Sequence, residues 1–153
     1  MMRGSCAVCA VLLAACGTAE EPTAVQAVDD DPTCADRGVE LTPELTLEAE
    51  PELEVTLVSL SPSSPVVGDN SWQVRLRQHG ALVEGATLRV VPWMPDHSHG
   101  STKTVRVSEL LPGYYELSPI NFRMPGYWEV GIDILLDGSE LGAVSFDTCL
   151  VRK

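Results

Sequence analysis

Short runs of alternating apolar and polar residues fill the chain from Leu53 onward. Strict alternation with a period of two is typical of strands that bury one face. The runs with this pattern begin at Leu53, Trp72, Leu88, Val105, Tyr115, Trp128 and Leu141. No stretch beyond Ser61 has a helical period. The pattern therefore predicts about seven strands and no helix in this part of the chain.

Turn residues separate these runs and indicate how the strands connect. Asp137-Gly138 is a strong signal for a two-residue hairpin, and Gln78-His79-Gly80-Ala81 predicts a second tight turn. Leu111-Pro112-Gly113 marks a third turn. About seven short strands in roughly a hundred residues predict an all-β fold, an immunoglobulin-like antiparallel β-sandwich. A small barrel is the alternative architecture.

The first residues have the layout of a bacterial lipoprotein signal peptide, which we assign to residues 1–15. Arg3 supplies the positive start, and an apolar run of roughly eight residues follows, far below the ~20 needed to span a bilayer. The run ends in Leu13-Ala14-Ala15-Cys16, which resembles the lipobox. We expect lipid on Cys16, membrane attachment through that lipid, and a cell-envelope protein facing the periplasm or the exterior. Gly17 favours the outer membrane if the source is Gram-negative. The alternative is a buried apolar helix followed by an unrelated cysteine.

The formal net charge of -12 is concentrated in the segment after Cys16. Residues 17–54 hold twelve acids and one base, Arg37, whereas residues 55–153 hold ten acids and eight bases. A charged, proline-containing segment with little apolar content stays extended. We expect an acidic, largely disordered tether over residues 16–52 and a folded domain over residues 53–153. Three leucines of the tether could still dock on the domain: Leu41, Leu45 and Leu47.

The tether has two interpretations, a solvated spacer or a segment that concentrates cations near the surface. The chain has no basic patch, so no nucleic-acid partner is expected.

Two cysteines remain after the signal peptide and Cys16 are set aside, namely Cys34 and Cys149. In an oxidising compartment such a pair is interpreted as a disulfide. It would join the start of the ordered region to the last strand. The alternative is a metal thiolate or redox pair, although neither cysteine lies in a C-x-x-C motif or near a histidine.

The segment from Pro92 to Ser101 carries the residues with the clearest chemistry. It contains two of the three histidines, His97 and His99, which in an extended loop would point the same way, and Met94 lies close by. Met124 precedes the strand that starts at Trp128, and in a sandwich the two loops could lie at one end. Imidazole with thioether is a soft ligand set that suits copper, Cu(I) in particular.

The same residues have a purely structural interpretation. The histidines could be polar surface and the methionines core filler. His79 belongs to a hairpin turn and is left out of the site. Trp93 and Trp128 are interpreted as core or rim packing rather than as ligands.

The motif Met94-Pro95-x-His97-x-His99-Gly100, the turn with Gly113 and Tyr115, and Pro125-Gly126-x-Trp128 resemble the YtkA-like domain family. These are small exported or membrane-anchored β-sandwich modules, related in outline to the FixH-type proteins. The resemblance covers roughly residues 55–146. It implies a sandwich fold, and it implies copper at Met94, His97, His99 and Met124, as in the periplasmic copper-handling proteins with which such modules are compared.

Two functional hypotheses follow. In the first, the chain is a lipid-anchored copper-binding module that acts as a chaperone, a buffer or an accessory to a copper protein. In the second, it is an immunoglobulin-type module that binds an envelope protein without metal. Zinc at the two histidines, completed by Asp96 or water, is a third option. The chain has no Gly-rich phosphate loop, no G-x-S-x-G and no H-E-x-x-H, so we expect no enzyme.

Overall fold

The computed structural model describes residues 34, 37 and 40–151, and strands make up most of them. The expected signal peptide (residues 1–15), the expected lipid site Cys16 and most of the expected tether lie outside the described residues. The elements are β1 (Thr46–Ala49), β2 (Leu53–Ser61), β3 (Gly68–Gln78), β4 (Ala81–Leu82), β5 (Thr87–Met94), the 3-10 helix η1 (Pro95–His97), β6 (His99–Gly100), β7 (Arg106–Leu111), β8 (Tyr114–Phe122), β9 (Gly126–Leu136) and β10 (Ser139–Leu150). No helix in this part of the chain has the length and apolar character to cross a bilayer.

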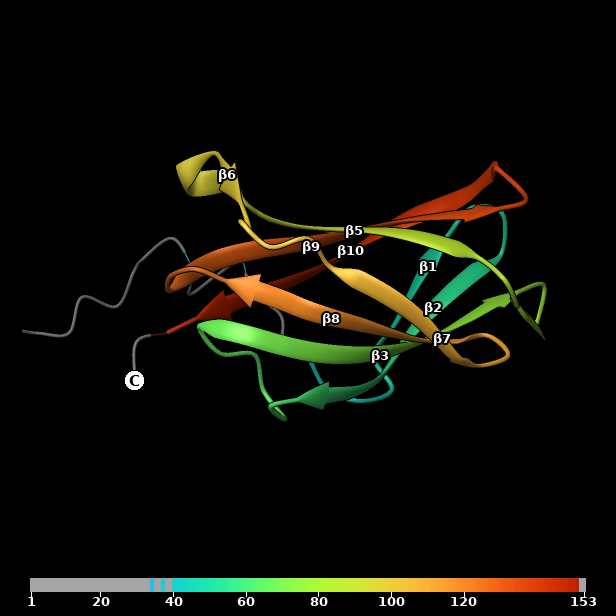
Figure 1. The fold of residues 1–153 in the computed structure, drawn as a ribbon, viewed down its shortest axis with the longest axis horizontal. Coiled ribbons are helices and arrows are strands. Elements are labelled where there is room, and N and C mark those ends of the chain that lie inside the picture. The colour runs from blue at the N-terminus through green and yellow to red at the C-terminus, as the bar shows by residue number, and fades with distance from the viewer. Residues whose placement is uncertain (1–33, 35–36, 38–39, 152–153) are drawn as a thin grey trace, which may run out of the picture.

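The strands form two antiparallel sheets that pack face to face (Figure 1). The first has the order β1-β2-β3-β8-β7, with β4 paired to β3, and the second has the order β10-β9-β5-β6. The seven longer strands therefore reproduce the A-B-E-D and C-F-G sheets of a constant-type immunoglobulin domain. The predicted sandwich is confirmed. The alternative of a closed barrel is wrong, because the two sheets remain separate and keep free edges.

The seven predicted strands correspond to β2, β3, β5, β7, β8, β9 and β10. The three additional strands are short: β4 and β6 have two residues each, and β1 has four. Alternation cannot be recognised over two to four residues. The count of about seven is therefore low for the described residues, which form ten strands, but right for the longer strands that form the sandwich.

The core lies between the sheets and is filled by the inward positions of the alternating runs. Its largest fully buried side chains include three from the first sheet, Trp72, Tyr115 and Phe122, and two from the second, Trp128 and Phe146. The Trp72 ring lies 6.1 Å from Phe146 and 6.3 Å from Phe122, centroid to centroid. Interleaved aromatic rings of this kind supply most of the buried apolar area in a small sandwich.

The two predicted hairpins are present with the backbone they require. Asp137 and Gly138 have φ of 50° and 79° and join Leu136 directly to its partner Ser139. His79 and Gly80 have φ of 51° and 78° and join β3 to β4. Positive φ at both central residues defines the type I′ turn, whose twist suits a hairpin. His79 is exposed, and its Nδ1 lies 2.8 Å from Oε2 of Glu52.

The folded region begins before residue 53, which corrects the expected boundary of the domain. β1 pairs with β2 from Thr46 to Ala49, and the side chain of Leu41 is buried in the core. Leu45 and Leu47 pack against the same core. The docking of these leucines agrees with the hypothesis. It follows that part of the acidic segment belongs to the sandwich, because every second residue of β1 is apolar and faces it.

Candidate metal site

The loop with the two histidines and the loop with Met124 lie at one end of the sandwich, as the sequence predicts. Trp93 at the end of β5 is the register partner of Glu129 near the start of β9. The start of β9 in turn pairs with the end of β10, where Cys149 faces Tyr127. Figure 1 shows β6 at the same end as the C-terminus. We call this end, formed by residues 93–100, 123–128 and 147–151, the site end.

A sharp reversal of the chain brings His97 and His99 together. Pro95 begins η1 with its φ already restricted, and Ser98 closes the turn at φ 51° by donating its N–H to the carbonyl of Pro95 at 3.1 Å. The chain then folds back as β6, so that the two imidazole centroids are 5.8 Å apart. The expectation that an extended loop aligns the two rings is wrong. Their proximity comes from the turn.

Gly100 explains why the motif ends in glycine. A Cβ at this position would lie 3.0 Å from the carbonyl oxygen of Pro92 and 3.5 Å from the Trp93 ring. Only a residue without a side chain lets β6 approach β5 this closely. The glycine therefore fixes the return path that places His99 beside β5.

Met94 lies directly opposite His99 in the β5–β6 ladder. Residues opposite each other in an antiparallel pair project to the same face, with Cβ atoms about 4.5–5.5 Å apart. The Met94 side chain is 1% exposed and belongs to the core, whereas His99 is half-buried and His97 is exposed. The three residues thus run from the core to the surface.

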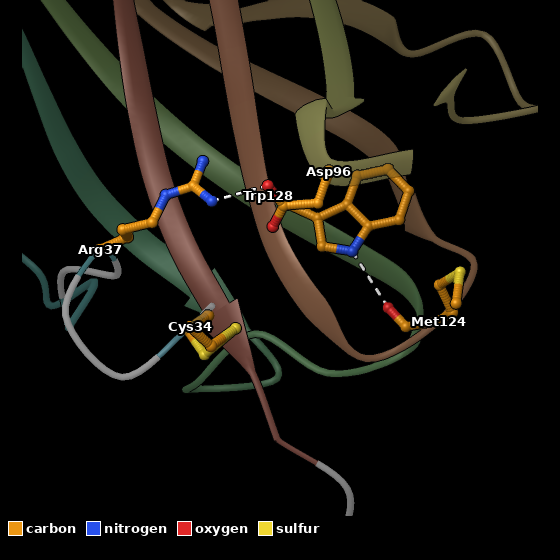
Figure 2. Close-up of a disulfide and its surroundings, with 6 residues drawn as sticks. Cys34, Arg37, Asp96, Met124 and Trp128 are labelled. Atoms are coloured by element: carbon orange, nitrogen blue, oxygen red, sulfur yellow. Dashed lines mark hydrogen bonds and ion pairs between the residues drawn. A yellow bond between two sulfur atoms is a disulfide. The ribbon is translucent and has the colours of Figure 1, made fainter. Parts of the chain in front are cut away.

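Trp128 joins this group to Met124. The indole is fully buried and its ring centroid lies 5.7 Å from that of His99 in an edge-on contact. Its Nε1–H donates to the carbonyl oxygen of Met124 at 3.0 Å (Figure 2). The Met124 side chain is half-buried against the core. The structure therefore brings the two imidazoles together and places Met94 opposite His99, whereas Met124 is connected to Trp128 through its backbone carbonyl.

The spacing of the imidazoles suits a shared ion. With metal–nitrogen bonds of about 2.0–2.1 Å, two imidazoles on one ion have ring centroids roughly 5–6 Å apart, and here the separation is 5.8 Å. The Nδ1 of His99 is 3.4 Å from the carbonyl oxygen of Gly100. A proton on that nitrogen would leave Nε2 as the metal-binding atom.

The acids and cysteines of the described residues add no third ligand to the two histidines. In residues 34, 37 and 40–151 no three His, Cys, Asp or Glu side chains come together as a metal-binding group. Asp96, the acid considered for zinc, is instead bound by Arg37, whose Nη1 is 2.7 Å from its Oδ1. Sulfur from Met94 or Met124 is therefore the available addition to the two imidazoles, and a thioether favours copper over zinc.

The predicted disulfide is present and fixes a turn at the site end. Cys34 and Cys149 are bonded, with their Cα atoms 5.3 Å apart. The N–H of Arg37 donates to the carbonyl of Cys34 at 3.3 Å, which closes a four-residue turn. The Arg37 guanidinium lies over the Tyr127 ring, 4.1 Å from its centroid, and reaches Asp96 (Figure 2).

Electrostatics support this arrangement. The hydrogen bond to Asp96 raises the pKa of Arg37, so the guanidinium is charged at every relevant pH. Burial, followed by a hydrogen bond to Asp147, raises the pKa of Tyr127 to about 12 and keeps the ring neutral beneath the cation. The face of a neutral phenol attracts a guanidinium.

The sequence did not predict three parts of the site end, namely Arg37, Tyr127 and the contact made by Trp128. One signal was present for Arg37: it is the single base among twelve acids in residues 17–54. A lone cation in an acidic segment, three residues after a cysteine expected to form a disulfide, is a candidate for a specific contact with the domain.

These observations define a class: a two-sheet antiparallel sandwich of immunoglobulin topology that carries a histidine and methionine cluster at the end closed by its disulfide. The family model described as YtkA-like matches residues 48–133. The match covers more than half of the chain, and the chain belongs to the YtkA-like family. A search among curated proteins finds no significant match. Membership indicates an extracytoplasmic β-sandwich module, and the family is not a known family of enzymes.

Proposed function

We propose that this chain is a cell-envelope lipoprotein, anchored through lipid on Cys16, whose sandwich domain binds copper. The ligands are His97 and His99 with sulfur from Met94 and Met124, and Cu(I) is the favoured state. The domain then acts as a chaperone, a buffer or an accessory that exchanges copper with another protein. It has no catalytic role in this proposal.

One observation carries the proposal: two imidazoles 5.8 Å apart, one of them opposite Met94 in the same ladder. The spacing fits one ion, and the neighbouring sulfur is a soft donor. A buried indole at 5.7 Å from His99 adds an apolar wall on the inner side. Such a wall restricts water and favours an ion of low charge.

The compartment supports the same function. A disulfide such as Cys34–Cys149 persists outside the reducing cytosol. The lipobox-like Leu13-Ala14-Ala15-Cys16 is an export signal with an anchor. If both hold, the domain is placed in the envelope, facing the periplasm or the exterior, where extracytoplasmic copper proteins would be its partners.

The test is a titration of the full chain, purified in mild detergent, with Cu(I) against a chromophoric chelator. Ascorbate as the reductant leaves the disulfide intact. The variant His97→Asn/His99→Asn removes the imidazoles, and Met94→Leu and Met124→Leu remove each sulfur at nearly constant volume. His79→Asn is the matched control, because the third histidine is exposed and lies in a hairpin, where asparagine tolerates its positive φ.

We expect one Cu(I) per chain, lost in the double histidine variant and unchanged in His79→Asn. Each methionine variant should weaken binding about tenfold or more. Because Trp128 contacts His99, copper should also quench tryptophan fluorescence in proportion to binding. Equal affinity in the wild type and the double histidine variant would refute the proposal.

A second candidate is an interaction module without metal, and one observation favours it. Leu82, Leu110 and Leu111 are 40%, 47% and 64% exposed. They lie at the end of the sandwich opposite the site end, where β4 adjoins the turn between β7 and β8. Exposed apolar side chains that gather at one end are typical of binding surfaces. Loss of partner capture on changing these leucines, with no copper bound by the wild type, would favour this candidate.

A further inference from the structure

The 3-10 helix η1, which carries His97, has few attachments of its own. It is three residues long, none of its residues is buried, and no side chain caps it. A single turn with one internal backbone bond is marginal without outside support. The β5–β6 pair holds both ends of this loop, so outside support can act on the middle of η1, next to His97.

Arg37 provides such support from a position 59 residues earlier in the chain. Its Nη1 is 2.7 Å from Oδ1 of Asp96, the central residue of η1. Its guanidinium also lies 4.1 Å from the centroid of the Tyr127 ring at the start of β9. One side chain thus connects the loop to a rigid strand.

The disulfide determines where Arg37 is. The bond to Cys149 fixes Cys34 on β10, and the hydrogen bond from the N–H of Arg37 to the carbonyl of Cys34 fixes the turn. An isolated ion pair between side chains that are 40% and 26% exposed contributes little, because ordering them costs entropy. A covalent tether raises the effective concentration of the guanidinium beside Asp96 and so removes much of that cost.

We propose that Arg37 is a positioning residue for the histidine loop, and that the Cys34–Cys149 disulfide is required for it to act. In this arrangement the loop is held for metal only after the disulfide has formed. The inference rests on the proposed copper function for its metal readout, but its structural part concerns the loop alone. Copper affinity is therefore coupled to the oxidation state of a cysteine pair that binds no metal.

The experiment uses the full chain and two readouts. The first is the Cu(I) affinity. The second is amide hydrogen exchange over residues 96–100 in the metal-free protein, which reports opening of the loop without copper. The variants are Arg37→Gln, Asp96→Asn, their combination, and Cys34→Ala/Cys149→Ala alone and with Arg37→Gln.

Lys103→Gln is the matched control. Lys103 forms an ion pair of similar exposure with Asp69, at 2.6 Å, in the same connection between β5 and β7. A general effect of removing a surface charge near the site would appear in this variant too. An effect of the support to η1 would not.

We expect Arg37→Gln to weaken Cu(I) binding about three- to tenfold and to speed exchange over residues 96–100 by a similar factor, because the competent loop is less populated. Asp96→Asn should match it, and the combination should be no worse than either change alone.

Cys34→Ala/Cys149→Ala should reproduce the effect, and Arg37→Gln should then add nothing. Lys103→Gln should stay within twofold of the wild type. The rates and affinities of Arg37→Lys should fall between those of the wild type and Arg37→Gln, since lysine keeps the charge but not the planar fork.

The two proposals fail in different ways. Wild-type exchange and affinity in Arg37→Gln would overturn the positioning role and leave the copper site standing. Faster exchange in Arg37→Gln with no copper bound by the wild type would overturn the copper site and support the positioning role. Wild-type behaviour in Cys34→Ala/Cys149→Ala would overturn the dependence on the disulfide.

Discussion

Removing the disulfide should cost the domain less stability than the length of its loop suggests. The bond closes a loop with a sequence separation of 115 in the unfolded chain. The chain-entropy model assigns a loop of this size about 4.8 kcal/mol. That figure assumes that Cys34 stays fixed in the folded protein when the bond is absent.

We expect this assumption to fail here. Among the described residues, Leu41 is the first after Cys34 that is buried in the core, at 3% exposed. Without the bond, the segment of about seven residues from Cys34 to Leu41 gains freedom in the folded state as well. Closure free energy grows as (3/2)RT ln n, so the ratio of the two loop lengths, about 16, leaves about 2.5 kcal/mol. The contacts of Arg37 limit the freedom that this segment gains in the folded state, so they can only raise the loss of stability above this value.

Urea unfolding of Cys34→Ala/Cys149→Ala, followed by tryptophan fluorescence, measures the effect. A loss of about 2.5 kcal/mol should lower the midpoint by about 1–2 M, and the slope should rise, because the unfolded chain is less compact without the cross-link. Reduced wild-type protein is the control, because it breaks the bond without removing atoms, and it should agree with the variant. A loss near 5 kcal/mol would show that the segment stays fixed without the bond, and a loss below about 1 kcal/mol would refute the loop reasoning altogether.

Three further outcomes follow from the described contacts. Tyr115→Phe should destabilise the domain by about 1–3 kcal/mol in the same urea assay. The buried hydroxyl donates to the carbonyl of Val83 at 2.8 Å and accepts from the N–H of Ala86 at 3.0 Å, and both backbone groups would lose this partner. A loss below about 0.5 kcal/mol would contradict this. Gly113→Ala should lower the stability of the domain by about 1–3 kcal/mol more than Gly138→Ala does. Both glycines have positive φ, but a Cβ at Gly113 would lie 3.0 Å from Leu82, whereas one at Gly138 would meet nothing within 4 Å. Equal losses of stability in thermal unfolding would show that the turn relaxes. The pKa of Tyr127 is raised from 10.0 to about 12, so the folded state favours the neutral phenol. The contribution of this shift to stability is complete below pH 10 and is lost as pH rises through about 12. An absorbance titration should show a tyrosinate step near pH 12 that Tyr127→Phe lacks.

The sequence predicts the sandwich well because the long strands have one buried face. Runs such as Trp128 to Ile134 alternate along their whole length, and the glycine turns between them have a clear chemistry. β1 was missed for a physical reason: its apolar residues, Leu47 and Ala49, are too few to show a period inside an acidic segment. β6 was missed because its two residues are held by the ladder with β5 and by the close approach at Gly100, which are tertiary effects.

The candidate site was predictable in composition but not in geometry. The residue types and the gathering of the loops at one end followed from the sequence and the topology. The turn at Pro95–His97 did not, because an extended loop and a 3-10 turn are both compatible with Pro-Asp-His. The role of Arg37 was also out of reach, since its partners Asp96 and Tyr127 are 59 and 90 positions away and only the folded chain brings them together.

The position of the disulfide also decides which end of the domain a lipid anchor on Cys16 would hold. The tether reaches the sandwich at Cys34, which is bonded at the site end, rather than at the end with the exposed leucines. If Cys16 carries lipid, the eighteen or so residues from Cys16 to Cys34 span at most about 60 Å even when fully extended. The histidine loop would then lie at the tethered end of the domain, within about that distance of the bilayer. Under the proposed function, a copper partner embedded in the same membrane, or close to its surface, would then be within reach of the histidine loop.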